Sequence, residues 1–184
     1  MAMTIRPIRY LGDPVLRLPT RRVRRVNSDI QLLVTDMIES MYATNGVGLA
    51  APQIGISLKL VVIGMPDETP FALINPEITK REGTRVVSEG CLSVPGYSGP
   101  VTRSERVTVR ALSAKGERVH ITSENDLLAQ ALEHETDHVN GLLYVDHLDV
   151  ALDMRYLHPR GDDRSDDEDM EELDGNLVEK SNNE

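Results

Sequence analysis

Apolar residues recur at helical spacing in two segments of this chain. In the first segment they follow an i, i+3, i+4 pattern, at Ile30, Leu33, Val34, Met37 and Met41. This pattern places them on one face of a helix. Ser28 and Gln31 have the spacing of a capping box, and Asn45-Gly46 is a common helix end. We therefore expect a helix that begins at Ser28 and stops at Asn45-Gly46.

A second helical pattern begins near Ser123, where Ser123 and Asp126 have the spacing of a capping pair. The apolar residues that follow it are Leu127, Leu128, Ala131 and Leu132. The pattern runs into HETDH, residues 134–138, and Gly141 is a typical helix end. We expect this helix to point the two histidines of HETDH into the body of the protein.

The segment between the two helices has the pattern of antiparallel strands. Two short apolar runs, LKLVVI at 58–63 and FALINP at 71–76, each predict a strand. Two later runs, RVTVRAL and ERVHIT, alternate, with inward sides at Val107, Val109 and Ala111 and at Val119 and Ile121. The intervening SAKG predicts a hairpin loop. A helix, then antiparallel strands, then a helix is an α+β order and not a repeating βαβ order.

Charge is distributed unevenly along the chain. The net charge is −10, and residues 159–184 hold eleven acidic against three basic residues. We expect one catalytic domain at 1–157 and an acidic tail at 158–184 that is disordered or loosely helical. Residues 1–26 hold seven Arg and one Asp. The run RRVRR at 21–25 could contact phosphates, but a solvated charged face is the simpler interpretation.

The sequence predicts neither a membrane span nor a signal peptide. No run approaches the ~18 apolar residues that a transmembrane helix needs. The N-terminal MAMTIRPIRYLGDP has no apolar core of the signal-peptide kind. Cys91 is the single cysteine, so no internal disulfide can form, as is usual in a reducing compartment. We therefore expect a cytoplasmic protein with no membrane partner and no nucleic-acid specificity.

HETDH contains H-E-x-x-H, which is a signature of zinc proteases. His134 and His138 are four residues apart, so their side chains leave one helix face one turn apart. Glu135 adds an adjacent carboxylate, which gives a metal-and-base arrangement. Two hydrogen-bonded core histidines are the alternative interpretation. A catalytic metal site also needs a third protein ligand and one position open to water.

The third ligand separates the candidate enzyme classes. A metzincin would place histidine where this chain has Tyr144, and only acidic residues of the tail lie where a gluzincin has its glutamate. Cys91, within EGCLSVP, offers a thiolate, which binds divalent transition metals strongly. The candidate set is Cys91, His134, His138 and water. An H-E-x-x-H metallopeptidase and a metal-stabilised binding module remain the alternatives.

Three segments together resemble peptide deformylase of the bacterial type. They are GVGLAAPQIG at 46–55, EGCLS at 89–93 and HETDH at 134–138. Their order and separation are specific, and the resemblance covers about residues 1–155. It implies an α+β fold with antiparallel sheets packed around a central helix that carries H-E-x-x-H. It also implies a metal-dependent hydrolase that removes the N-formyl group from the N-terminal methionine of new polypeptides and releases formate.

The resemblance implies a catalytic role for each matching position. The metal ligands would be Cys91, His134 and His138. The metal would be one divalent ion, commonly Fe²⁺, for which Zn²⁺ or Ni²⁺ can substitute. Glu135 would be the general acid and base. Gln53 and the backbone N–H of Leu92 would donate hydrogen bonds to the developing oxyanion.

The resemblance also implies how the substrate is held. Gly48 would hydrogen-bond the substrate backbone, and the methionine pocket would be lined by Val47, Val87, Leu127 and Ala131. The partners would be N-formylmethionyl nascent polypeptides and, transiently, the ribosome. The acidic tail does not support ribosome docking through a basic C-terminal extension of the kind found in the family.

The chain departs from the family at two positions near the site. Glu133 stands where Gln is common, and Gln130 stands where the methionine pocket commonly has an apolar residue. We also expect Arg103 to pair with Asp137 and so anchor the second helix, with an ordinary surface pair as the alternative.

Overall fold

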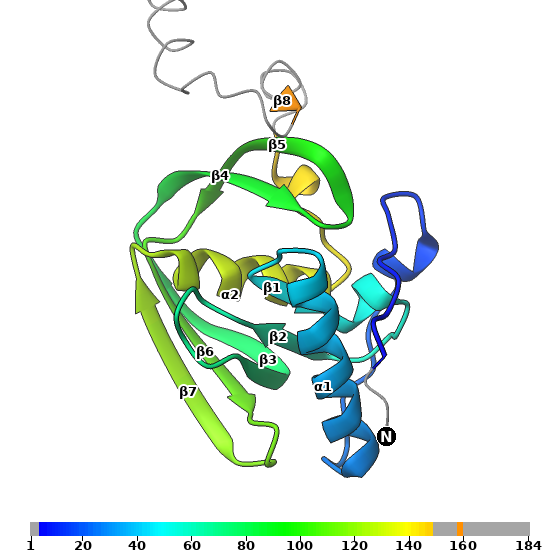
Figure 1. The fold of residues 1–184 in the computed structure, drawn as a ribbon. Coiled ribbons are helices and arrows are strands. Elements are labelled where there is room, and N and C mark those ends of the chain that lie inside the picture. The colour runs from blue at the N-terminus through cyan, green and yellow to red at the C-terminus, as the bar shows by residue number, and fades with distance from the viewer. Residues whose placement is uncertain (1–3, 149–157, 160–184) are drawn as a thin grey trace, which may run out of the picture.

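The computed structural model describes residues 4–148 and 158–159 (Figure 1). The predicted boundary between residues 157 and 158, and nearly all of the predicted acidic tail, lie outside the described residues and stay a prediction. The helices are α1 (Ser28–Ala43) and α2 (Leu127–His138), with 3₁₀ helices η1 (Pro14–Leu16), η2 (Ala51–Ile54) and η3 (Tyr144–His147). No helix in the described part of the chain is long and apolar enough to cross a membrane.

The strands form two antiparallel sheets. The five-stranded sheet has the order β1-β2-β3-β6-β7, from β1 (Gly48–Ala50), β2 (Leu60–Ile63), β3 (Phe71–Glu82), β6 (Arg106–Leu112) and β7 (Arg118–Glu124). The second sheet has the order β4-β5-β8, from β4 (Arg85–Cys91), β5 (Val94–Arg103) and β8 (His158–Pro159). Helix α2 runs between the five-stranded sheet and the β4–β5 hairpin (Figure 1). The predicted α+β fold with a central helix is therefore confirmed.

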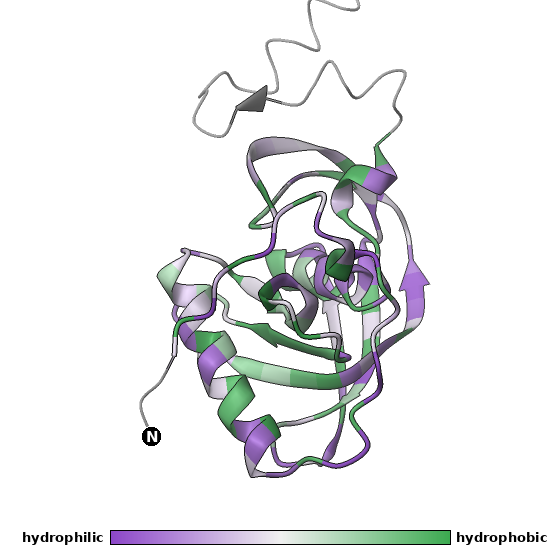
Figure 2. Ribbon diagram, turned by 90° about the vertical axis from the view of Figure 1, so that its right-hand side faces the viewer, coloured by the Kyte–Doolittle hydropathy of each residue, from purple (hydrophilic) through white to green (hydrophobic). Residues whose placement is uncertain are grey.

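Both faces of the five-stranded sheet are covered near β2. Leu60 and Val62 join the apolar cluster of α1, whereas Val61 and Ile63 join the cluster of α2. Successive residues of a strand point to opposite faces, so a strand covered on both sides is apolar throughout. This explains why the run LKLVVI does not alternate. Apolar colour continues through these central strands in Figure 2.

The predicted alternation in the β6–β7 hairpin is also present. Val107, Val109 and Ala111 are buried, and they pack in the cluster that contains Ala129 and Leu132 of α2. The hairpin pairs Leu112 with Arg118 across the predicted SAKG loop. This packing fixes the orientation of α2, and the two histidines of HETDH stand on that helix.

Helix α1 begins at Ser28 as expected, but the capping residues of both helices differ from the predicted ones. Asn27 caps α1, since its side chain accepts a hydrogen bond from the N–H of Ile30 at 3.1 Å, so Ser28 is the first helical residue and not the cap. Asp126 caps α2 by accepting from Ala129 N–H at 2.7 Å, while Ser123 belongs to β7. The hydroxyl of Ser123 donates to Asp126, so the pair is real although it lies before the helix.

The β4–β5 hairpin was not predicted. Its second strand begins VPGYSGP, whose glycines and prolines are typical of loops. It nevertheless pairs with β4 from Arg85↔Arg103 to Glu89↔Gly99 in an unbroken register. After a register shift the hairpin closes with Cys91 opposite Val94. This turn places Cys91 above α2.

Candidate metal centre

Three potential metal ligands converge between α2 and the end of β4. His134 and His138 stand one turn apart on α2, with Nε2 atoms 3.2 Å apart. The Sγ of Cys91 lies 3.2 Å from Nε2 of His138. All three donor atoms lie within 4.8 Å of one another. The structure therefore brings together the three residues that the sequence suggested as ligands.

The turn after β4 surrounds the sulfur of Cys91 with N–H groups. Ser93 directs its backbone N–H to Sγ at 3.4 Å, and Gln53 directs its side-chain amide to the same atom at 3.5 Å. These two contacts fix the position of the sulfur beside the histidines. A thiolate is the form in which cysteine binds a metal ion.

Glu89 orients the ring of His134. The Nδ1 of His134 lies 2.9 Å from Oε2 of Glu89. Burial alone would raise the pKa of Glu89, but hydrogen bonds from His134 and Arg103 outweigh it and lower this pKa to about 2. The carboxylate is then only an acceptor, so Nδ1 donates to it and Nε2 is the ring nitrogen that faces the centre.

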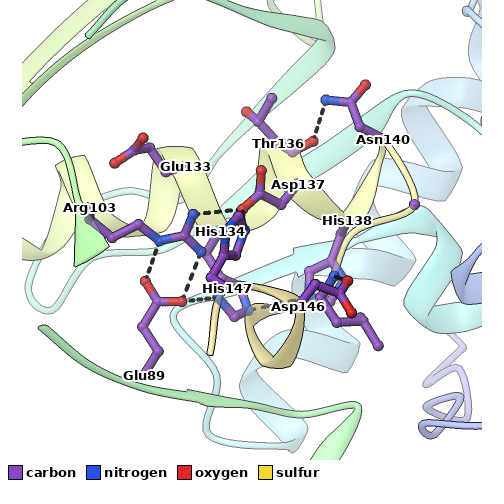
Figure 3. A network of polar contacts seen from close by, with 12 residues as sticks. Glu89, Arg103, Glu133, His134, Thr136, Asp137, His138, Asn140, Asp146 and His147 are labelled. Carbon is purple, nitrogen blue, oxygen red and sulfur yellow. Dashed lines mark hydrogen bonds and ion pairs between the residues drawn. The ribbon is translucent and has the colours of Figure 1, made fainter. Parts of the chain in front are cut away.

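Arg103 joins two buried carboxylates into one network (Figure 3). Its Nε and Nη2 donate to the two oxygens of Glu89 at 2.8 and 2.9 Å, and its Nη1 donates to Asp137 at 2.6 Å. His147 also contacts Asp137, at 2.8 Å. The predicted pair of Arg103 and Asp137 is confirmed, and it is buried, so it is not a surface pair. This polar network of Arg103, Glu89, Asp137, His134 and His147 links both strands of the hairpin to α2.

Glu133, the first departure from the family, has a defined set of partners. Its side chain is buried and accepts from the backbone N–H of Ser104 at 2.8 Å and from Nε of Arg81 at 2.9 Å. The hydroxyl of Ser104 lies 3.2 Å from the same carboxylate. Glu133 therefore ties α2 to β3 and to the corner that follows β5, next to Arg103.

Glu135 is a buried carboxyl group beside the three ligands. Its Oε2 has no hydrogen-bond partner among residues 4–148 and 158–159. Burial is the main cause that raises its pKa, to about 7. A side chain at Gly48 would overlap the Glu135 carboxyl, so glycine in β1 is what admits this group. A carboxyl group with a pKa near neutrality can both take and return a proton at neutral pH.

Gln53 is held in one orientation. Its Oε1 accepts the N–H of Ala50 at 2.8 Å, so its amide NH₂ points toward Ser93 Oγ, at 3.2 Å, and toward Cys91. It comes from η2, within GVGLAAPQIG, and is fully buried. The arrangement presents a fixed donor beside the ligands.

A cavity of about 140 Å³ opens at this site. Four residues next to the candidate ligands line it: Gly48, Gln53, Leu92 and Glu135. Three of the residues predicted to form the methionine pocket also line it: Val47, Leu127 and Ala131. Val87, also predicted, is half-buried on β4 opposite Val101 and is not among the lining residues, so its role stays a prediction.

Gln130, the second departure, does line the cavity. Its Nε2 donates to the backbone carbonyl of Ser88 on β4 at 3.1 Å. The amide group is therefore bound to the strand, and the aliphatic part of the side chain is available to the cavity.

The sequence reasoning missed Glu89, although a signal for it existed. Glu89 precedes Cys91 by two residues, and residues two apart in a strand share a face. A ligand cysteine facing α2 therefore implied that Glu89 also faces α2. Ser93 was missed too, because a backbone N–H that contacts sulfur leaves no trace in the residue pattern.

The comparisons with known proteins agree with this site. A sequence model of the family described as Polypeptide deformylase matches residues 5–152. A peptide deformylase of Dehalococcoides mccartyi is 47% identical over 172 residues, which are 93% of this chain and 99% of that protein. The crystal structure of a peptide deformylase from Legionella pneumophila is similar with a TM-score of 0.77 and 46% identity, over 80% of this chain and 88% of that one.

A further solved structure, a peptide deformylase from Synechococcus elongatus in complex with actinonin, is 38% identical with a TM-score of 0.75. That match covers 80% of this chain and 84% of the other. The family match spans most of the chain, including all three motifs, and the relative from Dehalococcoides mccartyi is matched over nearly its whole length. The chain belongs to the polypeptide deformylase family.

Proposed function

We propose that this protein is a metal-dependent hydrolase that removes the formyl group from N-formylmethionyl polypeptides and releases formate. The observation that carries the proposal is the convergence of Cys91, His134 and His138 beside a buried carboxyl group, Glu135, that lacks a hydrogen-bond partner in the described residues. If these residues had only a structural role, each buried polar atom would be expected to have a hydrogen-bond partner.

The three donors fit a divalent transition metal ion. Cys91, His134 and His138 offer one sulfur and two imidazole nitrogens within 4.8 Å of one another, and these are the donors that such ions prefer. The ion would supply Lewis acidity and would lower the pKa of a water molecule toward neutrality. We propose Fe²⁺ as the ion in the cell, with Zn²⁺ or Ni²⁺ able to replace it, and metal analysis of anaerobically purified protein tests this.

Glu135 is proposed as the group that moves the proton. With a pKa of about 7, it takes a proton from the attacking water and returns it to the amine that leaves. Glu135→Gln should retain bound metal and fold, because glutamine has nearly the same shape, and should lose turnover.

Gln53 and Leu92 are proposed as oxyanion donors. As water attacks the formyl carbon, negative charge develops on the formyl oxygen. The amide of Gln53, whose orientation is fixed by Ala50, and the N–H of Leu92 can meet that charge from the cavity wall. Removing one such donor typically lowers kcat about 10²–10³-fold.

The cavity supports a methionine side chain at the N-terminus. Val47, Leu127 and Ala131 give it apolar walls, and Gly48 leaves room for an approaching peptide backbone. New polypeptides carry this terminus, so we propose cytoplasmic location and transient contact with the ribosome.

The metallopeptidase alternative differs in its third ligand. Within the described residues, the cluster with metal-binding geometry contains Cys91 and no downstream carboxylate. The Cys91→Ala variant separates the two functions, since a peptidase would keep its metal and activity.

Incubation of formyl-Met-Ala-Ser with iron-, nickel- or cobalt-loaded protein should give loss of the formyl group by mass spectrometry. No loss with any of these ions would contradict the proposal.

A further inference from the structure

Five arginines form no ion pair with an acidic side chain of residues 4–148. They are Arg21, Arg22, Arg24, Arg25 and Arg118, and all are exposed. Every other arginine of residues 4–148 forms an ion pair or donates to a backbone carbonyl: Arg6, Arg9, Arg17, Arg81, Arg85, Arg103, Arg106 and Arg110. Four of the five arginines without an ion pair therefore lie within the single run RRVRR.

The backbone places the run RRVRR beside the start of β2 and against β3. Arg21 bridges to Leu58, and Lys59 N–H donates to the carbonyl of Arg21 at 2.8 Å. Val23 is anchored by Asn75, which exchanges two hydrogen bonds with its backbone at 2.8 and 2.9 Å. The run RRVRR thus lies as a fixed strand-like segment with its arginines outward and Val23 buried.

Two adjoining hollows are lined by these arginines. One, of about 390 Å³, has Arg22, Arg110, Arg118 and His120 in its lining. The other, of about 830 Å³, has Arg21, Arg22 and Arg24. Arg22 belongs to both linings, so the two hollows adjoin at this residue, and together they are called the basic groove. Glu77 is the single acidic residue among the residues that line the groove, and it is bound by Arg110 at 2.9 Å.

We propose that this basic groove, lined by Arg21, Arg22, Arg24, Arg110, Arg118 and His120, is a docking surface for the phosphate backbone of RNA. A guanidinium group presents a planar fork of donors that matches phosphate. A single small anion would meet two or three of these groups, whereas a polymer with regularly spaced phosphates can meet them all. The lining of the groove contains no Phe, Tyr or Trp and is mainly arginine, so the contact reads charge and not sequence.

The groove shares no lining residue with the cavity at the metal centre. A bound RNA would therefore leave the entrance to the catalytic site open. RNA binding at the groove does not depend on the proposed deformylation, so an experiment can contradict one proposal and leave the other standing.

The test is fluorescence anisotropy of a labelled RNA hairpin titrated with the full-length protein between about 50 and 200 mM salt. The double variant Arg22→Glu, Arg24→Glu should weaken binding at least tenfold. It should also reduce the slope of log affinity against log salt by about one unit for each phosphate group that the variant no longer binds.

The matched control is Lys80→Glu with Arg106→Glu. It changes the net charge equally, on exposed residues of the same sheet that already pair with Glu82. It should bind RNA nearly as the unaltered protein does. Both double variants should deformylate a short formyl peptide at the unaltered rate, because neither touches the metal centre. Equal loss of RNA binding in the two variants would overturn the proposal.

Two other occupants are outcomes of the same experiment. Anionic phospholipid vesicles that bind in an Arg22-dependent way, without RNA binding, would reassign the surface to a membrane. The acidic residues of the tail can compete for the groove, so the titration is repeated with Asp166, Asp167, Glu168 and Asp169 changed to amides. Binding that appears or tightens in this variant supports the groove, and absence of binding in both proteins rejects it.

Discussion

The five-stranded sheet and the β4–β5 hairpin enclose the same helix by different physical means. On the sheet side of α2, the cluster contains twelve buried residues, among them Val61, Leu73 and Val109. On the hairpin side, the cluster contains only four, Cys91, Val94, Val101 and Tyr144. The hairpin compensates with the polar network, in which Arg103 binds Glu89 and Asp137.

The difference shows how the molecule divides stability from chemistry. Burial of apolar surface is non-directional, so the sheet holds α2 without fixing any one side-chain angle. Ion pairs and hydrogen bonds are directional, so the hairpin holds the ring of His134 and the sulfur of Cys91 in defined positions. The same contacts leave the hairpin vulnerable, since a buried charge that loses its partner is costly.

The largest expected effect is that of Arg103→Met. It leaves Glu89 and Asp137 as buried carboxylates without their cation, so the free energy of unfolding should fall by about 3–5 kcal/mol. Metal affinity should also fall, by about 10–100-fold, because Glu89 no longer holds His134. Urea unfolding measures the change in unfolding free energy, and metal titration measures the change in metal affinity. Arg106→Met is the control, because Arg106 and both its acidic partners, Glu82 and Glu124, are exposed. Equal losses in both variants would contradict this account of the hairpin.

A truncation on the sheet side should separate stability from metal binding. Leu73 is almost fully buried in the cluster beneath α2. Leu73→Ala should cost about 2–5 kcal/mol of unfolding free energy. The metal-to-protein ratio of the folded enzyme should stay unchanged, because no candidate ligand stands on β3. Val86→Ala, on the exposed side of β4, is the control and should cost little.

Gly48→Ala tests the point where the five-stranded sheet reaches the site. The added methyl group would overlap the Glu135 carboxyl and displace it. A displacement of about 1 Å can cost 10²-fold in rate, so we expect kcat/KM to fall about a hundredfold with metal still bound. Gly64→Ala is the control, because its methyl group would meet the flexible ends of the Met41 and Tyr42 side chains and Gly64 does not line the cavity. A rate for Gly48→Ala equal to that of the control would show that Glu135 has room to move.

The smallest expected effect lies on the far side of the sheet, at Asp36 of α1. Its carboxylate accepts from Arg6 at 2.8 Å and from the N–H of Thr4 at 3.2 Å, and these contacts hold the N-terminal segment. Asp36→Asn should cost about 1 kcal/mol.

The pH dependence of this pair has a definite sign. The hydrogen bond from Arg6 is the main cause that lowers the pKa of Asp36 below 3.8. The carboxylate therefore contributes stability above pH 3.8 and loses it as the pH falls through its lower folded pKa. The difference in unfolding free energy between the unaltered protein and Asp36→Asn should shrink over that acidic range. If the difference in unfolding free energy stayed constant over this pH range, the contact with Arg6 would not be the cause of the lowered pKa of Asp36.

The same division explains what the sequence could predict. Val107, Val109 and Ala111 alternate because one face of β6 is covered, and such alternation is visible in a residue pattern. The β4–β5 hairpin has buried Glu89 and Arg103 and a run of glycine and proline, so its burial is opposite to what residue types suggest. Its strands were missed for that reason.

The candidate site was more predictable than the strands that carry it. Cys91, His134 and His138 are chemically rare residues within short motifs, so spacing was enough to group them. The partners of Glu133 could not be predicted, because Ser104 and Arg81 meet it only through the register of β3, β5 and β6. The helix caps were displaced by one and three residues, because Asn27 and Asp126 took the capping positions in place of nearby Ser28 and Ser123.

The position of Cys91 on the hairpin has a thermodynamic consequence. Two donors of the candidate centre belong to α2 and the third to the hairpin, so an ion held by all three would crosslink two layers that share few apolar contacts. An ion that binds only the folded protein adds RT ln(1 + [L]/Kd), about 4 kcal/mol at a thousandfold excess over Kd. The metal ion would then stabilise the fold as well as take part in catalysis. The hairpin would open more readily in protein molecules whose metal site is empty.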